Sequence, residues 1–155
     1  MRAIFVDFDG VLHDVDAVAV TYECYSMVIT GERLFEHMPI FEHLLADHPD
    51  VHIVIHSSWR NHFPPDQLRL RFPESLRSRI HGVTMRGSQR YAGILDYAEA
   101  HGVSDYIILD DMPGEFCYDG PPPDELIICH EKHGIGSPSV QAQISEWLAA
   151  TRGRE

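Results

Sequence analysis

The stretch FVDFDGVLHD, residues 5–14, places three acidic residues and a glycine directly after an apolar run near the N-terminus. The run at residues 3–6 contains β-branched and aromatic side chains and no polar one, which is typical of a strand buried on both faces of a parallel sheet. Asp7 and Asp9 are two residues apart, so an extended backbone directs both carboxylates to the same side. Acidic residues and glycine are also common in turns, so this stretch does not identify an active site by itself.

Three further apolar runs have the form of buried strands, at residues 51–56, 106–109 and 125–129. Segments with the apolar spacing of helices lie between and after them, at residues 40–45, 91–98 and 137–148. This alternation predicts an α/β fold, a doubly wound parallel sheet with helices on both faces. In such sheets ligands bind beyond the carboxyl ends of the strands, and the polar clusters DFD, SSWR and DD all follow predicted strands.

The composition limits the possible partners and compartments. With 155 residues, 44% of them hydrophobic, the chain suits one domain over residues 1–155. Its 24 acidic and 12 basic residues give a net charge of -12, which disfavours an extended nucleic-acid-binding surface. Cys24, Cys117 and Cys129 lack metal-site spacing, which favours reduced thiols. No apolar stretch reaches membrane-spanning length, so we expect a cytoplasmic protein with no membrane partner.

The predicted topology brings Asp7, Asp9 and the pair Asp110-Asp111 to one edge of the sheet. Like charges in close proximity repel unless a cation or a proton offsets them. Oxygen ligands prefer hard divalent ions, so the sequence predicts a Mg²⁺ site at this edge. Gly10 permits a turn or a close backbone approach there.

The three clusters resemble, in order, motifs of the haloacid dehalogenase (HAD) superfamily, and specifically of its phosphatases. DFDGVLH at residues 7–13 is similar to motif I, VIHSSWR at 54–60 to motif II and ILDDMP at 108–113 to motif IV. The resemblance covers about the whole chain and implies a HAD-like, Rossmann-like catalytic domain. The SSWR and LDD sequences are also similar to small HAD-like domains associated with RNA-end repair.

The resemblance implies a role for each acidic residue. Asp7 would attack phosphorus and form an aspartyl phosphate, and Asp9 would act first as general acid and then as general base. Mg²⁺ would bind Asp7, the backbone carbonyl of Asp9 and the carboxylate of Asp111. Asp110 would lie behind the metal ligands and orient the cation of motif III.

Motifs II and III leave alternatives open. Ser57 would hydrogen-bond a phosphoryl oxygen, with Ser58 as a neighbouring donor, although either serine could instead cap the following segment. The single lysine lies outside the window for motif III, so an arginine is expected there. Arg90, at the start of the helix before ILDD, fits this position, with Arg86 and Arg60 as rivals.

The segments around motifs I and II suggest how substrates reach the site. Trp59 and Arg60 could line the substrate mouth, although core burial is expected for Trp59. His13 could reach the rim of the site, but eleven histidines weaken a claim for any one. Asp14 is expected to be solvated within a short flap at about residues 11–30. Neither interval between motifs accommodates a large cap domain, so the open site would admit a phosphate on a larger molecule, such as a nucleic-acid end or a phosphoprotein.

These features predict a Mg²⁺-dependent phosphomonoester hydrolase that acts through phospho-Asp7. A phosphotransferase would use the same residues and pass the phosphoryl group to another hydroxyl. A third hypothesis is a non-catalytic, receiver-like domain that binds phosphate for signalling. Receiver domains carry the acceptor Asp after the third strand, whereas the middle strand here ends in serines. The sequence does not indicate an oligomeric state.

Overall fold

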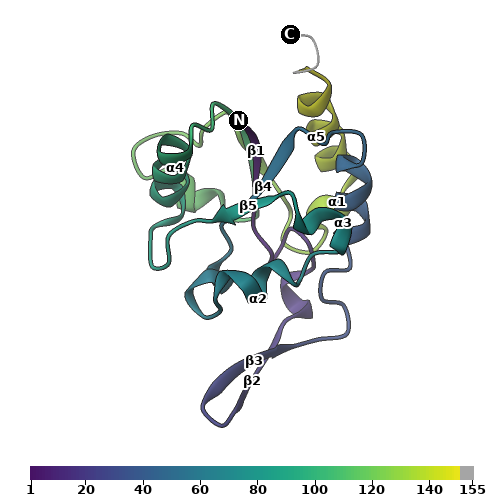
Figure 1. Ribbon diagram of the computed structural model, residues 1–155, viewed down its shortest axis with the longest axis vertical. Helices are drawn as coiled ribbons and strands as arrows, with labels where there is room; N and C mark the ends of the chain where they lie inside the picture. The colour runs from purple at the N-terminus through teal and green to yellow at the C-terminus, as the bar shows by residue number, and fades with distance from the viewer. Residues whose placement is uncertain (151–155) are drawn as a thin grey trace.

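The main sheet has five parallel strands in the order β5-β4-β1-β6-β7, in a computed structural model that describes residues 1–150 (Figure 1). The strands are β1 (Arg2–Val6), β4 (Val51–Ile55), β5 (Ile80–Val83), β6 (Asp105–Asp110) and β7 (Leu126–Ile128). β1 is central, and all its residues after Arg2 are buried. This confirms the α/β fold with a parallel sheet.

The register of β1 with its two neighbours aligns the ends of three strands. Val6 pairs with Ile55 on β4 and with Leu109 on β6. The backbone N–H of Asp7 donates to the carbonyl of Leu109 at 3.2 Å, so Asp7 leaves the sheet level with the end of β6. Motifs I, II and IV therefore meet at one sheet edge, as predicted.

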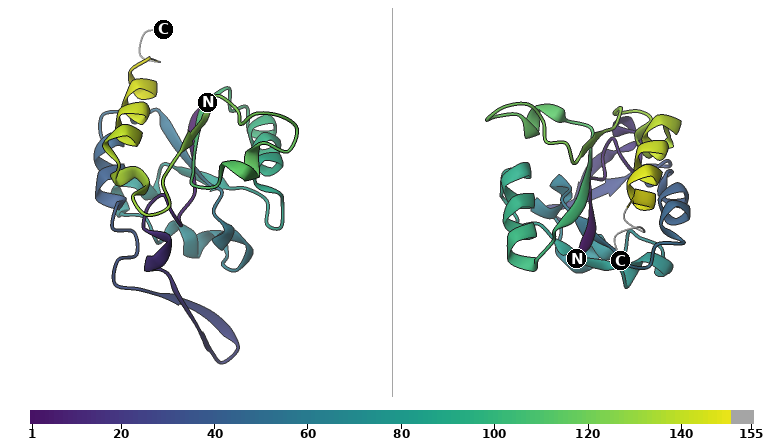
Figure 2. Two further views of the ribbon diagram at one scale, coloured as in Figure 1. Left: turned by 180° about the vertical axis from the view of Figure 1, so that it is seen from behind. Right: turned by 90° about the horizontal axis from the view of Figure 1, so that it is seen from above.

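Helices cover both faces of the sheet (Figure 2). The helices are α1 (Met38–Leu45), α2 (Pro65–Arg69), α3 (Glu74–Arg77), α4 (Arg90–His101) and α5 (Pro138–Ala150). Ile4 and Val6 belong to the apolar cluster that includes residues of α1 and α5, whereas Phe5 packs in a second cluster with Ile94 of α4. The alternation of side chains along β1 thus supplies both layers of the core. Gly102 ends α4 in the left-handed conformation, which glycine adopts without steric cost.

A β-hairpin forms the flap that follows motif I. Its strands are β2 (Ala19–Glu23) and β3 (Ser26–Thr30), and it extends away from the sheet (Figure 1). Ile29 is buried against the core, while Tyr25 at the turn is fully exposed. Within residues 1–150, no insertion forms a large cap domain.

The structure corrects several expectations about single elements. Asp14 is not solvated: it is 9% exposed, and its Oδ1 accepts the backbone N–H of Asp16 at 2.8 Å to cap a short 3₁₀ helix. The strand β5 was not predicted from the sequence. Cys24, Cys117 and Cys129 are free thiols, as predicted.

None of the helices in residues 1–150 is long and apolar enough to cross a membrane.

Candidate active site

Arg90 connects the two buried acids at the carboxyl end of the sheet. Its Nη1 donates to Oδ2 of Asp7 at 3.0 Å and to Oδ2 of Asp110 at 2.7 Å. The other oxygen of Asp7, Oδ1, accepts the backbone N–H of Phe8 at 2.8 Å. Because Arg90 is the first residue of α4, this helix places the guanidinium over the ends of β1 and β6. The cation that the sequence suggested for motif III thus contacts the predicted nucleophile directly.

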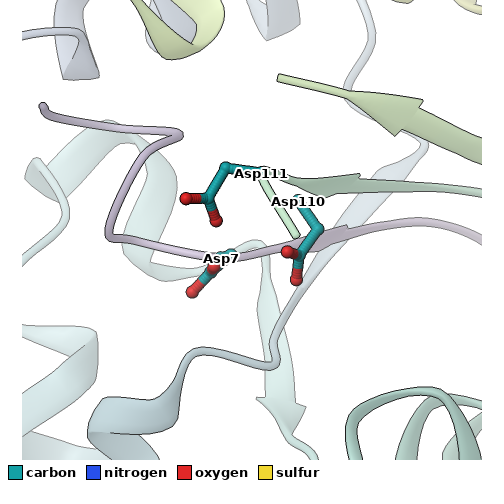
Figure 3. A group of neighbouring side chains, drawn as sticks. All are labelled: Asp7, Asp110 and Asp111. Atoms are coloured by element: carbon teal, nitrogen blue, oxygen red, sulfur yellow. The ribbon is translucent and has the colours of Figure 1, made fainter. Parts of the chain in front are cut away.

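Three carboxylates converge beside this arginine. Asp7, Asp110 and Asp111 each offer an oxygen atom, and these oxygens lie within 4.8 Å of one another (Figure 3). Asp7 follows β1, and Asp110 and Asp111 stand at the end of β6. Asp110 and Asp7 are almost completely buried, whereas Asp111 is partly exposed.

Burial and mutual repulsion shift the protonation of this cluster. Burial raises the pKa of Asp7 well above its usual range, and the charge of Asp110 raises it further. The same two causes raise the pKa of Asp111 to about 6. Burial alone would lower the pKa of Arg90, but the charges of Asp7 and Asp110 raise it above its ordinary value. One permanent cation therefore faces three acids and does not neutralise them all.

The donor set fits a hard divalent cation. All the candidate ligand atoms are carboxylate oxygens, which Mg²⁺ prefers. Burial and then repulsion from Asp110 raise the pKa of Asp7 and of Asp111, and a bound cation would offset this repulsion. Asp110 already accepts hydrogen bonds from Arg90 and, through Oδ1, from the backbone N–H of Met112 at 2.8 Å. Within the acidic pair, the partly exposed Asp111 is therefore the better candidate for a direct ligand. Asp7 also accepts hydrogen bonds, from Arg90 and from the backbone N–H of Phe8, so metal binding by Asp7 and by the carbonyl of Asp9 remains a prediction.

Asp9 is held by two ring nitrogens. The indole Nε1 of Trp59 donates to both of its oxygens, at 3.1 Å and 3.2 Å, and Nε2 of His13 lies 2.8 Å from Oδ1. Trp59 is buried, as expected from the sequence, and His13 is completely buried. Neither contact with Asp9 was anticipated, although SSWR and GVLH placed both rings within reach of motif I.

The two serines of motif II have different surroundings. Ser57 is buried, and its Oγ accepts the backbone N–H of Trp59 at 3.2 Å, so it caps the 3₁₀ helix Ser58–Asn61. Its hydroxyl proton remains available for a second partner. Ser58 is partly exposed. The structure therefore confirms the capping alternative for Ser57, and binding of a phosphoryl oxygen by either serine stays a prediction.

The guanidinium of Arg60 is bonded to backbone carbonyl oxygens. Its guanidinium donates to the carbonyl oxygens of His56, Ser57, Met85 and Ser88 at 2.7 Å to 3.2 Å. Four of its five N–H groups are thereby occupied, and the side chain is 5% exposed. These bonds connect motif II to the loop before α4 and leave little of the guanidinium for a ligand. The structure thus gives no support to the predicted substrate-binding role of Arg60, and the rival Arg86 is exposed.

His56 is a further buried group beside the acids. Its Nε2 lies 3.2 Å from the carbonyl oxygen of Leu109 and 3.7 Å from Oδ2 of Asp110. Burial lowers the pKa of His56 to about 4, so the ring is neutral at physiological pH. A neutral ring with its proton on Nε2 donates toward the acids without adding a second permanent cation.

Three features of the parallel sheet together define a HAD-type domain. A DxD motif follows β1, a serine cluster follows β4, and an acidic pair stands at the end of β6. Residues 3–140 match the family described as the HAD domain in Swiss Army Knife RNA repair proteins, and the chain therefore belongs to this family. The match confirms the predicted HAD resemblance, including its similarity to domains of RNA repair. No curated protein matches the sequence.

Proposed function

We propose that this protein is a Mg²⁺-dependent phosphomonoester hydrolase that acts through an aspartyl phosphate on Asp7, with Asp9 as general acid and base. The contact between Arg90 and Asp7 carries this proposal, because it places a permanent cation against the nucleophile at the point where phosphoryl charge would lie. Membership in the HAD family supports a phosphatase-type activity and argues against a receiver-like signalling domain. We further propose that residues 1–155 form a single catalytic domain.

The side chains divide the reaction into two displacements. In the first, an oxygen of Asp7 bonds to phosphorus, the ester P–O bond breaks, and Asp9 gives its proton to the departing alkoxide. In the second, Asp9 takes a proton from water as the water oxygen bonds to phosphorus. This step releases inorganic phosphate and regenerates the carboxylate of Asp7. Arg90 holds the nucleophile and neutralises phosphoryl charge in both steps.

Asp7 and Asp111, with the backbone carbonyl of Asp9, would hold the Mg²⁺ ion. When bound, the ion supplies positive charge that offsets the carboxylates and stabilises the transferring phosphoryl group. Asp110 would hold the guanidinium of Arg90 in position, since its Oδ2 accepts a hydrogen bond of 2.7 Å from Arg90.

The substrate we propose is a phosphate at the end of a nucleic acid. The family is named for RNA repair proteins, and residues 1–150 form no large cap that would close the site over a small molecule. The net charge of -12 argues against tracking along many phosphates, which is consistent with recognition of a single terminal one.

Phosphate release provides the test. The parent protein, Asp7→Asn and Asp9→Asn are assayed with and without Mg²⁺ on an aryl phosphate. The parent is also assayed on oligonucleotides with 3′- or 5′-phosphates and on nucleotides, sugar phosphates and phosphopeptides. We expect Mg²⁺-dependent turnover that Asp7→Asn abolishes, and preference for one oligonucleotide end over sugar phosphates, nucleotides and phosphopeptides. Unchanged turnover in Asp7→Asn would disprove the mechanism, and turnover of small metabolites alone would disprove the substrate class. Transfer of the phosphoryl group to an added alcohol in place of water would indicate a phosphotransferase.

A further inference from the structure

Asp9 accepts hydrogen bonds from two aromatic rings that come from different parts of the chain. His13 stands in the loop after β1 and Trp59 in the 3₁₀ helix after β4. Oδ1 of Asp9 lies 2.8 Å from Nε2 of His13 and 3.1 Å from Nε1 of Trp59. Among residues 1–150, Oδ2 has one hydrogen-bond contact, of 3.2 Å, with the same indole nitrogen.

The backbone fixes the direction of the histidine bond. Nδ1 of His13 accepts the N–H of Phe35 at 3.2 Å, so this nitrogen carries a lone pair and no proton. A neutral ring then has its proton on Nε2 and donates it to Asp9. The indole N–H of Trp59 can only donate. Both rings therefore donate to the carboxylate of Asp9.

Both donors are held in place by packing. The ring of His13 packs edge-on against Phe35 at a centroid distance of 4.9 Å, and the ring of Trp59 packs edge-on against Phe8 at 5.3 Å. The loop that carries His13 is closed by a hydrogen bond of 2.9 Å from the N–H of Gly10 to the carbonyl of His13. The donors cannot turn away from Asp9 without disturbing these contacts.

The bonds leave the two oxygens of Asp9 unequal. Both oxygens share the indole N–H of Trp59, whereas Oδ1 also receives the N–H of His13. The side chain of Asp9 is 34% exposed although His13 is fully buried, so part of the carboxyl remains open to a substrate.

We propose that His13 and Trp59 are positioning residues that orient the carboxyl group of Asp9 and leave Oδ2 as the oxygen that carries the catalytic proton. This inference rests on the proposed function. Oδ2–H gives its proton to the ester oxygen as the P–O bond breaks and Asp7 bonds to phosphorus. Oδ2 then takes a proton from the water that attacks the aspartyl phosphate. Without the two N–H groups, the carboxyl of Asp9 is less well oriented and protonates the leaving group less often.

Leaving-group dependence separates this role from a merely structural one. Trp59→Phe and His13→Phe each remove an N–H donor and keep an aromatic ring. Their kcat/KM values are measured with Mg²⁺ on phenyl phosphate and on 2,4-dinitrophenyl phosphate. This parameter covers the steps up to formation of the aspartyl phosphate. The phenolate needs a proton as it departs, whereas the dinitrophenolate does not.

We expect each variant to lose about tenfold or more in kcat/KM on phenyl phosphate and to stay within about threefold of the parent on the dinitrophenyl ester. Asp9→Asn should show the same pattern with a larger loss. His13→Gln, which offers an amide N–H in place of the imidazole, should recover part of the activity on phenyl phosphate.

Trp147→Phe is the matched control, because it removes an indole N–H that donates to Asp105 Oδ1 at 3.0 Å, away from the site residues. It should match the parent on both substrates. Circular dichroism and thermal unfolding confirm that each variant is folded. Trp59→Phe carries the test alone if His13→Phe does not fold.

An equal loss on both substrates, or no loss on either, overturns the positioning role while the parent remains a phosphatase. The proposed function fails separately if the parent hydrolyses neither ester or if Asp7→Asn remains active.

Discussion

Gly10 lies against the side chain of Asp111, so any larger residue at this position would have to displace that side chain. A Cβ atom built on Gly10 would stand 2.3 Å from Oδ2 of Asp111, and the backbone there has a φ of +75°. We expect Gly10→Ala to displace the Asp111 carboxylate and to destabilise the fold by about 1 to 3 kcal/mol. Chemical denaturation measures the stability, and phosphate release measures the accompanying loss of activity.

Gly102→Ala separates the effect of backbone strain from the effect of the contact with Asp111. Gly102 also has a positive φ, +64°, but apart from its chain neighbours no atom of residues 1–150 lies within 4 Å of the added Cβ. This control should lose stability through backbone strain alone, by about 1 kcal/mol, and should keep its activity. Equal activity in Gly10→Ala and Gly102→Ala would show that the Gly10 and Asp111 contact is not needed for function.

Mg²⁺ should stabilise the folded protein through Asp111. A ligand that binds only the native state raises its unfolding free energy, so the melting temperature of the parent should rise with added Mg²⁺. Asp111→Asn removes one charged oxygen ligand and should therefore weaken Mg²⁺ binding. The Mg²⁺ concentration that gives half of the rise in melting temperature should increase at least tenfold. Asp96→Asn, at an exposed position on α4, is the control of equal charge change and should respond like the parent. A parent protein that does not respond to Mg²⁺ would contradict the metal site.

Arg90 should be the motif III cation. Arg90→Met removes the charge from between Asp7 and Asp110 and should lower kcat/KM by about 10²- to 10³-fold. Arg90→Lys keeps the charge but not the fork of donors, so an intermediate loss is expected. Arg86→Met tests the exposed rival and should match the parent. A larger loss in Arg86→Met than in Arg90→Met would reverse this assignment.

The sequence predicted the parts of the fold that depend on local pattern. Apolar runs such as residues 3–6 have the length and composition of buried strands. Parallel pairing of these strands then brings the polar residues that follow them to one edge of the sheet. The strand β5 was missed because its sequence, IHGV, has only four residues, and only Ile80 among them is buried.

The supporting contacts of the site could not be predicted because they depend on tertiary packing. Arg60 is bonded to backbone carbonyls, and no sequence pattern marks a carbonyl as lacking a partner. His13 and Trp59 meet Asp9 only after β1 and β4 pair in register. By contrast, the pairing of Arg90 with Asp110 was anticipated, because the resemblance to HAD phosphatases implies that Asp110 orients the motif III cation.

The buried His56 should make the metal-free protein sensitive to acid. Its pKa is lowered to about 4 in the folded state from 6.5, so unfolding takes up a proton between these values. The stabilisation is present above the unfolded pKa and is lost as pH falls toward the folded one. From about pH 7 to about pH 5 the loss should be on the order of 2 kcal/mol.

The measurement is chemical denaturation in the presence of a chelator for the parent and for His56→Phe. The raised pKa values of Asp7 and Asp111 act in the opposite direction, since a carboxyl with a raised folded pKa lowers stability as pH rises. Both proteins share these acids, so the difference between their pH slopes isolates His56. The parent should lose more stability than His56→Phe over this interval, and parallel pH profiles would show that the neutral ring of His56 does not carry the acid sensitivity.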